Sequence, residues 1–130
     1  MLPHAPVISI VDDDKFVRES LRRLMKSLGY RAFAHPSADD FLKSPYLRET
    51  SCLIADVQMP RMTGADLFRH LSETGRAIPT IFITAYPDDG ARARALRDGA
   101  VCYLTKPFKE SDLLRGIQLA LERKAGESDP

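Results

Sequence analysis

The chain has no tryptophan, only two cysteines, and no apolar run near the roughly 20 residues that a membrane-spanning helix needs. Its first six residues lack a basic segment followed by a long apolar one, so they do not resemble a secretion signal. Cys52 and Cys102 have neither CxxC spacing nor a nearby histidine cluster, which disfavours zinc and favours two buried free thiols. These absences favour a cytoplasmic protein with no membrane partner.

An excess of charge of one sign is also missing, since the formal net charge of the 130 residues is +1. Without a strong positive field, we expect no direct contact of this chain with nucleic acid. Hydrophobic residues make up 44% and charged residues 28%, a balance that disfavours disorder. The length suits one core. We expect one domain over residues 1–125 and a frayed polar tail over residues 126–130.

Short apolar runs alternate with segments of helical periodicity. One such segment places Val17, Leu21, Leu24 and Leu28 on one face. The alternation predicts an α/β fold, in which a parallel five-stranded sheet carries helices on both faces. The predicted strands are Val7–Val11, Tyr30–Ala34, Cys52–Ala55, Thr80–Thr84 and Val101–Leu104.

Polar residues stand where four of these strands end. In parallel sheets, ligands bind beyond the carboxyl ends of the strands, so these side chains are expected to meet at one edge. They are Asp12, Asp13 and Asp14 after the first strand, Asp56 after the third, Thr84 at the end of the fourth and Lys106 after the fifth.

Clustered carboxylates need a proton or a cation, because two charges about 4 Å apart repel by roughly 4 kcal/mol at an effective dielectric constant near 20. Oxygen ligands without histidine or cysteine favour Mg²⁺. Asp56 then has two roles open to it, as a metal ligand and as a nucleophile that forms an aspartyl phosphate. Lys106 and Thr84 would supply positive charge and a hydrogen bond to the transferred phosphoryl group.

Four segments in this order resemble the receiver domain of two-component response regulators, over about Val7 to Arg123. They are Val11–Asp14, Asp56–Pro60 with Gly64, Ile83–Ala85 and Lys106–Phe108. The acidic run and Gly99–Val101 are similar, more narrowly, to the FixJ-like group. The resemblance implies the flavodoxin-like (βα)5 fold, a doubly wound sheet with strand order 2-1-3-4-5.

The resemblance also implies roles for the acidic residues. Asp56 would be the phosphoacceptor. Asp13 and Asp56 would bind Mg²⁺ directly together with the main-chain carbonyl of Gln58, and Asp12 would act mostly through water. A solvated acidic turn, with Asp14 capping the next helix, is the alternative for the first carboxylates.

A switch and its partners are implied in the same way. Thr84 and Lys106 would hold the phosphoryl oxygens, and the Lys106–Pro107 bond would be cis. The ring of Tyr103 would turn inward, unless it is simply a packed residue. The surface of the fourth helix, fifth strand and fifth helix would then change partners. The expected partners are a sensor histidine kinase or phosphotransfer protein, and a second copy bound through that surface.

Three residues depart from what a fast switch requires. Tyr86 lies two positions after Thr84, where its ring would screen the phosphoryl site, and Pro87 stiffens the same loop. Gln58 offers an amide and no carboxylate to orient attacking water. These three loop residues predict slow self-dephosphorylation.

Other functions fit the sequence less well. An aspartate phosphatase of the haloacid dehalogenase type needs an acid at position 58, where this chain has Gln58. A flavin-binding module needs a Ser/Thr/Gly-rich phosphate loop in place of Asp12–Asp14. An interaction module that is never phosphorylated would not need the acidic set. The chain is therefore not expected to be an enzyme, beyond catalysing its own phosphorylation and dephosphorylation.

Overall fold

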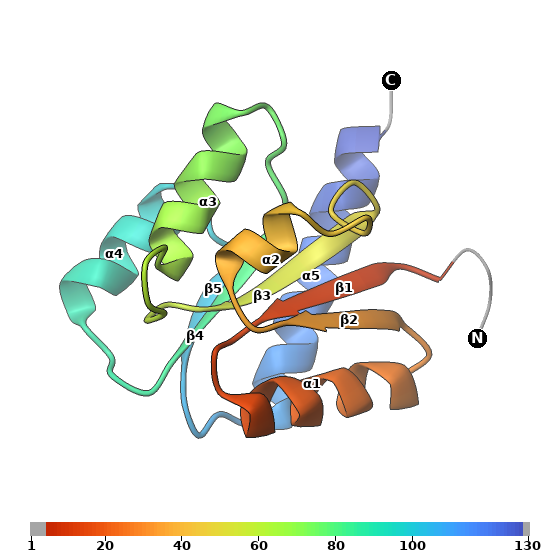
Figure 1. Ribbon diagram of the computed structural model, residues 1–130, viewed down its shortest axis with the longest axis horizontal. Coiled ribbons are helices and arrows are strands. Elements are labelled where there is room, and N and C mark those ends of the chain that lie inside the picture. Colours follow the sequence, from red (N-terminus) through yellow and green to blue (C-terminus); the bar gives the residue numbers. More distant parts are fainter. Residues whose placement is uncertain (1–4, 129–130) are drawn as a thin grey trace.

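The computed structural model describes residues 5–128, with side chains to residue 124, as five parallel strands flanked by helices (Figure 1). The strands are β1 (Val7–Val11), β2 (Arg31–His35), β3 (Thr50–Asp56), β4 (Thr80–Thr84) and β5 (Cys102–Thr105). The helices are α1 (Lys15–Ser27), α2 (Ala38–Leu42), α3 (Gly64–Glu73), α4 (Asp89–Arg97) and α5 (Glu110–Ser128). The sheet order β2-β1-β3-β4-β5 confirms the predicted fold class and strand order.

Helices cover both faces of the sheet, which is why the central strands lack the alternation of a half-exposed strand. Neighbouring residues of β3 point to opposite layers. Ile54 belongs to the same buried cluster as Leu21 of α1 and Ile117 of α5. Leu53 belongs to a second cluster with Leu67 of α3. Because every residue of β1 and β4 is buried, these strands give the site a rigid base.

The strand register brings the predicted site residues to one edge. Ala55 pairs with Val11, and Asp56, the next residue, pairs with Ile83. Thr84 in turn pairs with Thr105, so Lys106 follows directly. From β1 the chain runs to β2 on one side, and it then crosses back past β1 to enter β3 on the other side. The crevice between β1 and β3 is therefore the topological switch point.

Some boundaries differ from the predicted ones. Strand β2 runs one residue later than expected, because the carbonyl of His35 accepts a hydrogen bond from the N–H of Asp12 and continues the ladder. At the other end of the chain, α5 continues past the expected boundary at residue 125, since no proline interrupts it before Ser128. Residues 126–128 of the expected tail are thus helical, and residues 129 and 130 lie outside the described residues.

The two cysteines are free thiols in different surroundings. Cys52 is fully buried, as expected, and burial raises the pKa of its thiol. Cys102 is only partly buried, which differs from the prediction, and burial raises its pKa to about 11. Within the described residues, no helix is both long and apolar enough to span a membrane.

Candidate functional site

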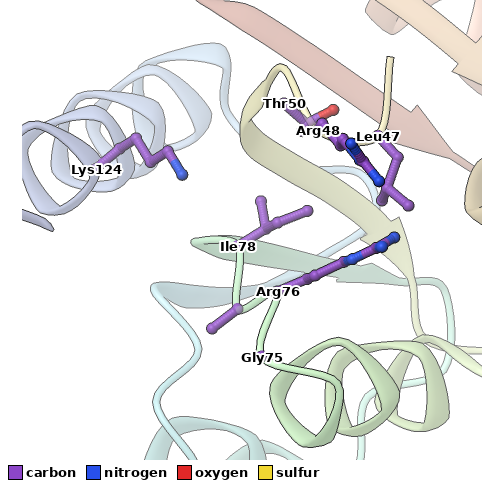
Figure 2. A pocket seen from close by; sticks show the side chains of 8 residues that line it. Leu47, Arg48, Thr50, Gly75, Arg76, Ile78 and Lys124 are labelled. Atoms are coloured by element: carbon purple, nitrogen blue, oxygen red, sulfur yellow. The ribbon is translucent and has the colours of Figure 1, made fainter. Parts of the chain in front are cut away.

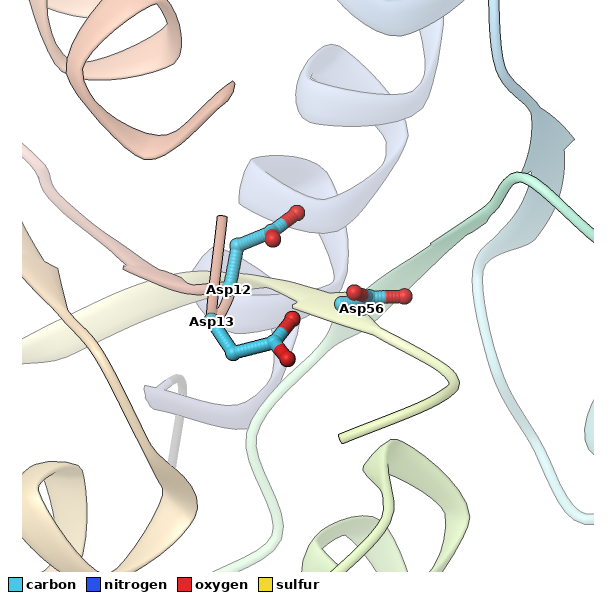
Figure 3. Close-up of side chains that lie close together, drawn as sticks. All are labelled: Asp12, Asp13 and Asp56. Atoms are coloured by element: carbon cyan, nitrogen blue, oxygen red, sulfur yellow. The ribbon is translucent and has the colours of Figure 1, made fainter. Parts of the chain in front are cut away.

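Three carboxylates meet at the switch point. Asp12, Asp13 and Asp56 each present an oxygen within 4.8 Å of the others (Figure 3). Asp12 is fully buried and Asp56 is 6% exposed, whereas Asp13 is exposed to solvent. The structure therefore brings together the acidic residues that the strand ends predict, with one carboxylate open to an arriving ion or partner.

Local hydrogen bonds fix the acidic loop after β1. The main-chain N–H of Asp14 donates to Oδ1 of Asp12 at 2.8 Å, and the Asp14 carboxylate caps α1 by accepting from the N–H of Phe16 at 2.8 Å. The guanidinium of Arg18 donates to the carbonyls of Asp12 at 3.2 Å and Asp13 at 3.3 Å. This contact of Arg18 was not predicted from the sequence, because the charge of a helix residue does not indicate which way its side chain points.

Lys106 connects the last strand to the first. Its ammonium lies 3.0 Å from Oδ2 of Asp12 and 3.7 Å from Oδ2 of Asp56. The side chain is only 18% exposed, so this charge is held among the carboxylates. The Lys106–Pro107 peptide bond is cis, as the resemblance implies.

The surroundings of Asp56 disfavour the ionised form of its carboxyl group. Burial is the main cause that raises its pKa to about 6, and the neighbouring charges of Asp12 and Asp13 add to it. The N–H of Gln58, which donates to Oδ1 of Asp56 at 3.1 Å, and the Lys106 ammonium oppose the shift. A carboxylate with a raised pKa in a crevice between strand ends is typical of a reactive group.

The loop after β3 is tightly folded against Asp56. The N–H of Gly64 donates to the carbonyl of Val57 at 3.0 Å. A Cβ on Gly64 would collide with the main-chain oxygen of Asp56, so only glycine fits here. Arg61 adopts a left-handed conformation with φ of 69°, which is uncommon outside glycine. The loop that carries Gln58 is thereby held close to the carboxylate.

The predicted switch residues occupy the neighbouring strands. Thr84 is fully buried, and its hydroxyl oxygen accepts a hydrogen bond from the N–H of Tyr86 at 3.0 Å. Tyr103 is 4% exposed, and its buried hydroxyl has no hydrogen-bond partner among the described residues. The ring of Tyr86 is 70% exposed, and Pro87 beside it is exposed too. The Tyr86 main chain therefore contacts Thr84 while its ring stands in solvent.

The donor set fits a hard divalent cation. Asp12, Asp13 and Asp56 offer carboxylate oxygens, and no histidine or cysteine joins them within the described residues. Mg²⁺ prefers one or two carboxylates and keeps several waters, which an exposed Asp13 permits. Three carboxylates face the single positive charge of Lys106, and the remaining negative charge favours such an ion.

The sequence profile of the response regulator receiver domain matches residues 8–118. This range contains all the residues of the acidic cluster, together with Thr84 and Lys106. The chain belongs to this family. It is thus a receiver domain of a two-component response regulator, a signalling domain.

Named relatives support the same placement. The chain is 45% identical to the response regulator protein TmoT of Ectopseudomonas mendocina, over 89% of this chain and 53% of that protein. It is 36% identical to the transcriptional regulatory protein FixJ of Rhizobium meliloti (strain 1021), over 94% of this chain and 60% of that protein. The chain thus spans about half the length of the curated relatives it matches.

Solved structures agree with the fold and with the FixJ-like resemblance. The response regulator StyR matches with a TM-score of 0.87 and 37% identity, over 95% of this chain and 62% of that one. FixJ-N matches with a TM-score of 0.81 and 34% identity, over 92% of this chain and 95% of that one.

Proposed function

We propose that Asp56 accepts a phosphoryl group from the phosphohistidine of a sensor histidine kinase or phosphotransfer protein, in a Mg²⁺-dependent reaction. The observation that carries the proposal is the placement of Asp56, whose carboxylate lies at the switch point beside Asp12, Asp13 and the Lys106 ammonium. Such a transfer needs alignment and charge neutralisation more than further chemistry from the protein.

In this reaction an oxygen of Asp56 attacks phosphorus, the phosphorus–nitrogen bond of the donor breaks, and the imidazole leaves with a proton from solvent. Asp56 has to be ionised to attack, and a pKa of about 6 leaves most of it ionised at neutral pH. When bound by Asp13, Asp56 and the Gln58 carbonyl, with Asp12 acting mostly through water, Mg²⁺ would neutralise charge on the phosphoryl oxygens. Lys106, already 3.7 Å from Asp56, supplies the second positive charge.

Phosphorylation then changes the surface of α4, β5 and α5. Thr84 donates its hydroxyl to the phosphoryl group, while Tyr103, which is only 4% exposed, already holds the inward position. Helix α4 has no buried residue, so it is free to shift at little cost in packing. Leu96 of α4 and Leu119 of α5 are 39% and 45% exposed, which supports a homodimer or an output partner on this surface.

The loop residues set the lifetime of the aspartyl phosphate. Gln58 is exposed at the mouth of the site and carries no carboxylate to orient an attacking water. Tyr86 and Pro87 follow Thr84 at the end of β4, and both are exposed. We therefore assign a slow self-dephosphorylation to this domain, and substitution of Tyr86 by alanine shortens the lifetime if its ring screens the site.

Acetyl phosphate tests the proposal without a cognate kinase. Intact mass measured after incubation with acetyl phosphate and Mg²⁺ is expected to increase by one phosphoryl group in the wild type. Asp56→Asn is expected to gain none, and circular dichroism of that variant checks that it is folded. Equal gain in Asp56→Asn, or in wild type with EDTA in place of Mg²⁺, would overturn the assignment.

A further inference from the structure

A second charged hollow lies at the edge of the sheet opposite to Asp56 (Figure 2). It is formed where β3 begins, where β4 begins, by the turn after α3 and near the end of α5. Its lining residues are Leu47, Arg48, Thr50, Gly75, Arg76, Ala77, Ile78 and Lys124. Since parallel strands begin at the edge opposite to their ends, the length of β3 separates this hollow from the acidic cluster.

The charge of this hollow is of one sign. Among the residues whose side chains the structure describes, the charged ones that line it are Arg48, Arg76 and Lys124, and none is acidic. Three other hollows that contain arginine also contain an aspartate, which is Asp112 in one, Asp98 in another and Asp40 in a third. A smaller adjoining hollow shares Leu47 and Arg76 with this one and has no acidic residue among its described lining. In a chain of net charge +1, the two arginines on one hollow form a local anion-attracting site.

The main chain that carries the two arginines is well ordered by hydrogen bonds. Arg48 lies in the turn before β3, where the Thr50 hydroxyl bonds the carbonyl of Tyr46 at 2.8 Å and the hydroxyl of Ser9 at 2.7 Å. Arg76 follows Gly75, whose φ is +73°, and its N–H donates to the carbonyl of Leu71 at 2.8 Å.

The ends of these two side chains are available to a ligand. Both arginines are exposed, and neither guanidinium has a hydrogen bond or ion pair to any residue in the described part of the chain. Because the main chain at both arginines is already fixed, an anion can bind between the two guanidinium groups without the entropic cost of ordering the backbone.

We propose that this hollow binds a small organic phosphate, with the phosphate group between Arg48 and Arg76 and the apolar body against Leu47 and Ile78. Each guanidinium group can donate two parallel hydrogen bonds to two oxygens of one phosphate. This geometry favours a phosphate group over a ligand with only one acceptor atom. The volume of about 570 Å³ lies within the range of about 300–1,000 Å³ that is usual for small-molecule sites. Inorganic phosphate alone would leave the apolar side of the hollow unused, which consists of the exposed Ala77 and the small accessible parts of Leu47 and Ile78, each 6% exposed.

Amide chemical shifts in Mg²⁺-free buffer test this site, with phenyl phosphate as the probe. We expect phenyl phosphate to shift the amides of Gly75, Ala77 and Ile78 in a saturable way at millimolar concentration. Inorganic phosphate is expected to shift them with weaker affinity. The double variant Arg48→Gln/Arg76→Gln is expected to lose about tenfold or more in affinity. Its matched control, Arg92→Gln/Arg97→Gln on α4, removes the same charge elsewhere and should bind as the wild type does.

Several results would overturn the proposal. One is the absence of shifts at millimolar probe, and another is an equal loss of affinity in both double variants. A third is a set of shifts confined to Asp13, Gln58 and Thr84, which would place the probe in the acidic crevice. Tighter binding of an acidic aspartate–leucine peptide than of phenyl phosphate would assign the hollow to a protein partner. Phosphorylation of Asp56 is measured separately, so either proposal can fail without the other.

Discussion

The ammonium of Lys106 lies 3.0 Å from the carboxylate of Asp12, a side chain with no exposure to solvent, although 94 positions separate the two residues. This contact joins the end of β5 to the end of β1 across the acidic cluster. Because the buried Asp12 charge depends on a partner, the pair couples the stability of the domain to the occupation of the site.

Substitution Lys106→Met is expected to lower the free energy of unfolding by about 2 kcal/mol without Mg²⁺, because it leaves the Asp12 carboxylate buried without its ion-pair partner. Added Mg²⁺ should recover part of this loss, since an ion that binds only the folded state stabilises it. Urea unfolding with and without Mg²⁺ measures both effects. The exposed Lys109→Met is the control and should change stability by less than about 0.5 kcal/mol. Equal losses in the two variants would show that the contact is not stabilising.

The pKa of Asp56 predicts how stability depends on pH without metal. The folded-state pKa of about 6 lies above the ordinary value of 3.8, so the folded state binds more protons than the unfolded state between these values. Stability contributed by this group is present below about pH 4 and falls as the pH rises to about 6, by about 1–3 kcal/mol. Asp56→Asn removes this penalty and should be more stable than the wild type at pH 7.5, with a smaller difference at pH 4.

Comparing the stability of the wild type and Asp56→Asn at each pH controls for the other titrating groups, because these are present in both proteins. His35, for example, has a pKa lowered by burial, and its contribution to stability rises with pH in both proteins. A difference between wild type and Asp56→Asn that does not change from pH 4 to pH 7.5 would contradict the raised pKa.

The strand ends made much of this site predictable. Asp12, Asp56, Thr84 and Lys106 could be assigned to one edge because parallel strands of known order fix where their last residues lie. Strand order does not determine where a long, flexible side chain points. The contact of Arg18 with two carbonyls and the convergence of Arg48 and Arg76 therefore became visible only in the structure.

Burial of polar atoms was similarly hidden. Tyr103 was predicted as a switch residue by resemblance, yet the burial of its hydroxyl without a partner among the described residues follows from its place in a core cluster with Phe82 and Ala100. The shift of β2 to include His35 depends on a hydrogen bond from Asp12, which a propensity for strand does not encode. Short-range sequence patterns predict the helices and strands. Whether a single polar atom finds a hydrogen-bond partner depends on how the core packs around it.

Tyr103→Phe is expected to raise the free energy of unfolding by about 1 kcal/mol, because it removes a buried hydroxyl that lacks a partner. Thermal unfolding measures the change. Tyr86→Phe provides the matched control, since it deletes the same atom from a ring that is 70% exposed, and should leave stability unchanged. A destabilised Tyr103→Phe would show that the hydroxyl does have a partner.

Gly64→Ala is expected to destabilise the domain by about 1–3 kcal/mol, because the added Cβ collides with the main-chain oxygen of Asp56. The loop must move to relieve the collision, so the rate of phosphorylation by acetyl phosphate should also fall. Gly90→Ala in the first turn of α4 is the control, because its Cβ meets only the flexible end of Arg94 at 3.3 Å and a side chain of Asp88 at 3.4 Å. A fully active and stable Gly64→Ala protein would contradict the close contact.

The dependence of phosphorylation on Mg²⁺ in two neighbouring carboxylate variants tests the central claim most directly. Asp13→Asn removes a member of the acidic cluster, whereas Asp14→Asn makes the same charge change at the helix cap, which asparagine also fills. With acetyl phosphate as donor, Asp13→Asn is predicted to raise the Mg²⁺ concentration for half-maximal rate about tenfold or more, and Asp14→Asn to change it by less than about twofold. Equal effects of the two substitutions, or a wild-type rate that does not depend on Mg²⁺, would contradict a cation-assisted site around Asp56.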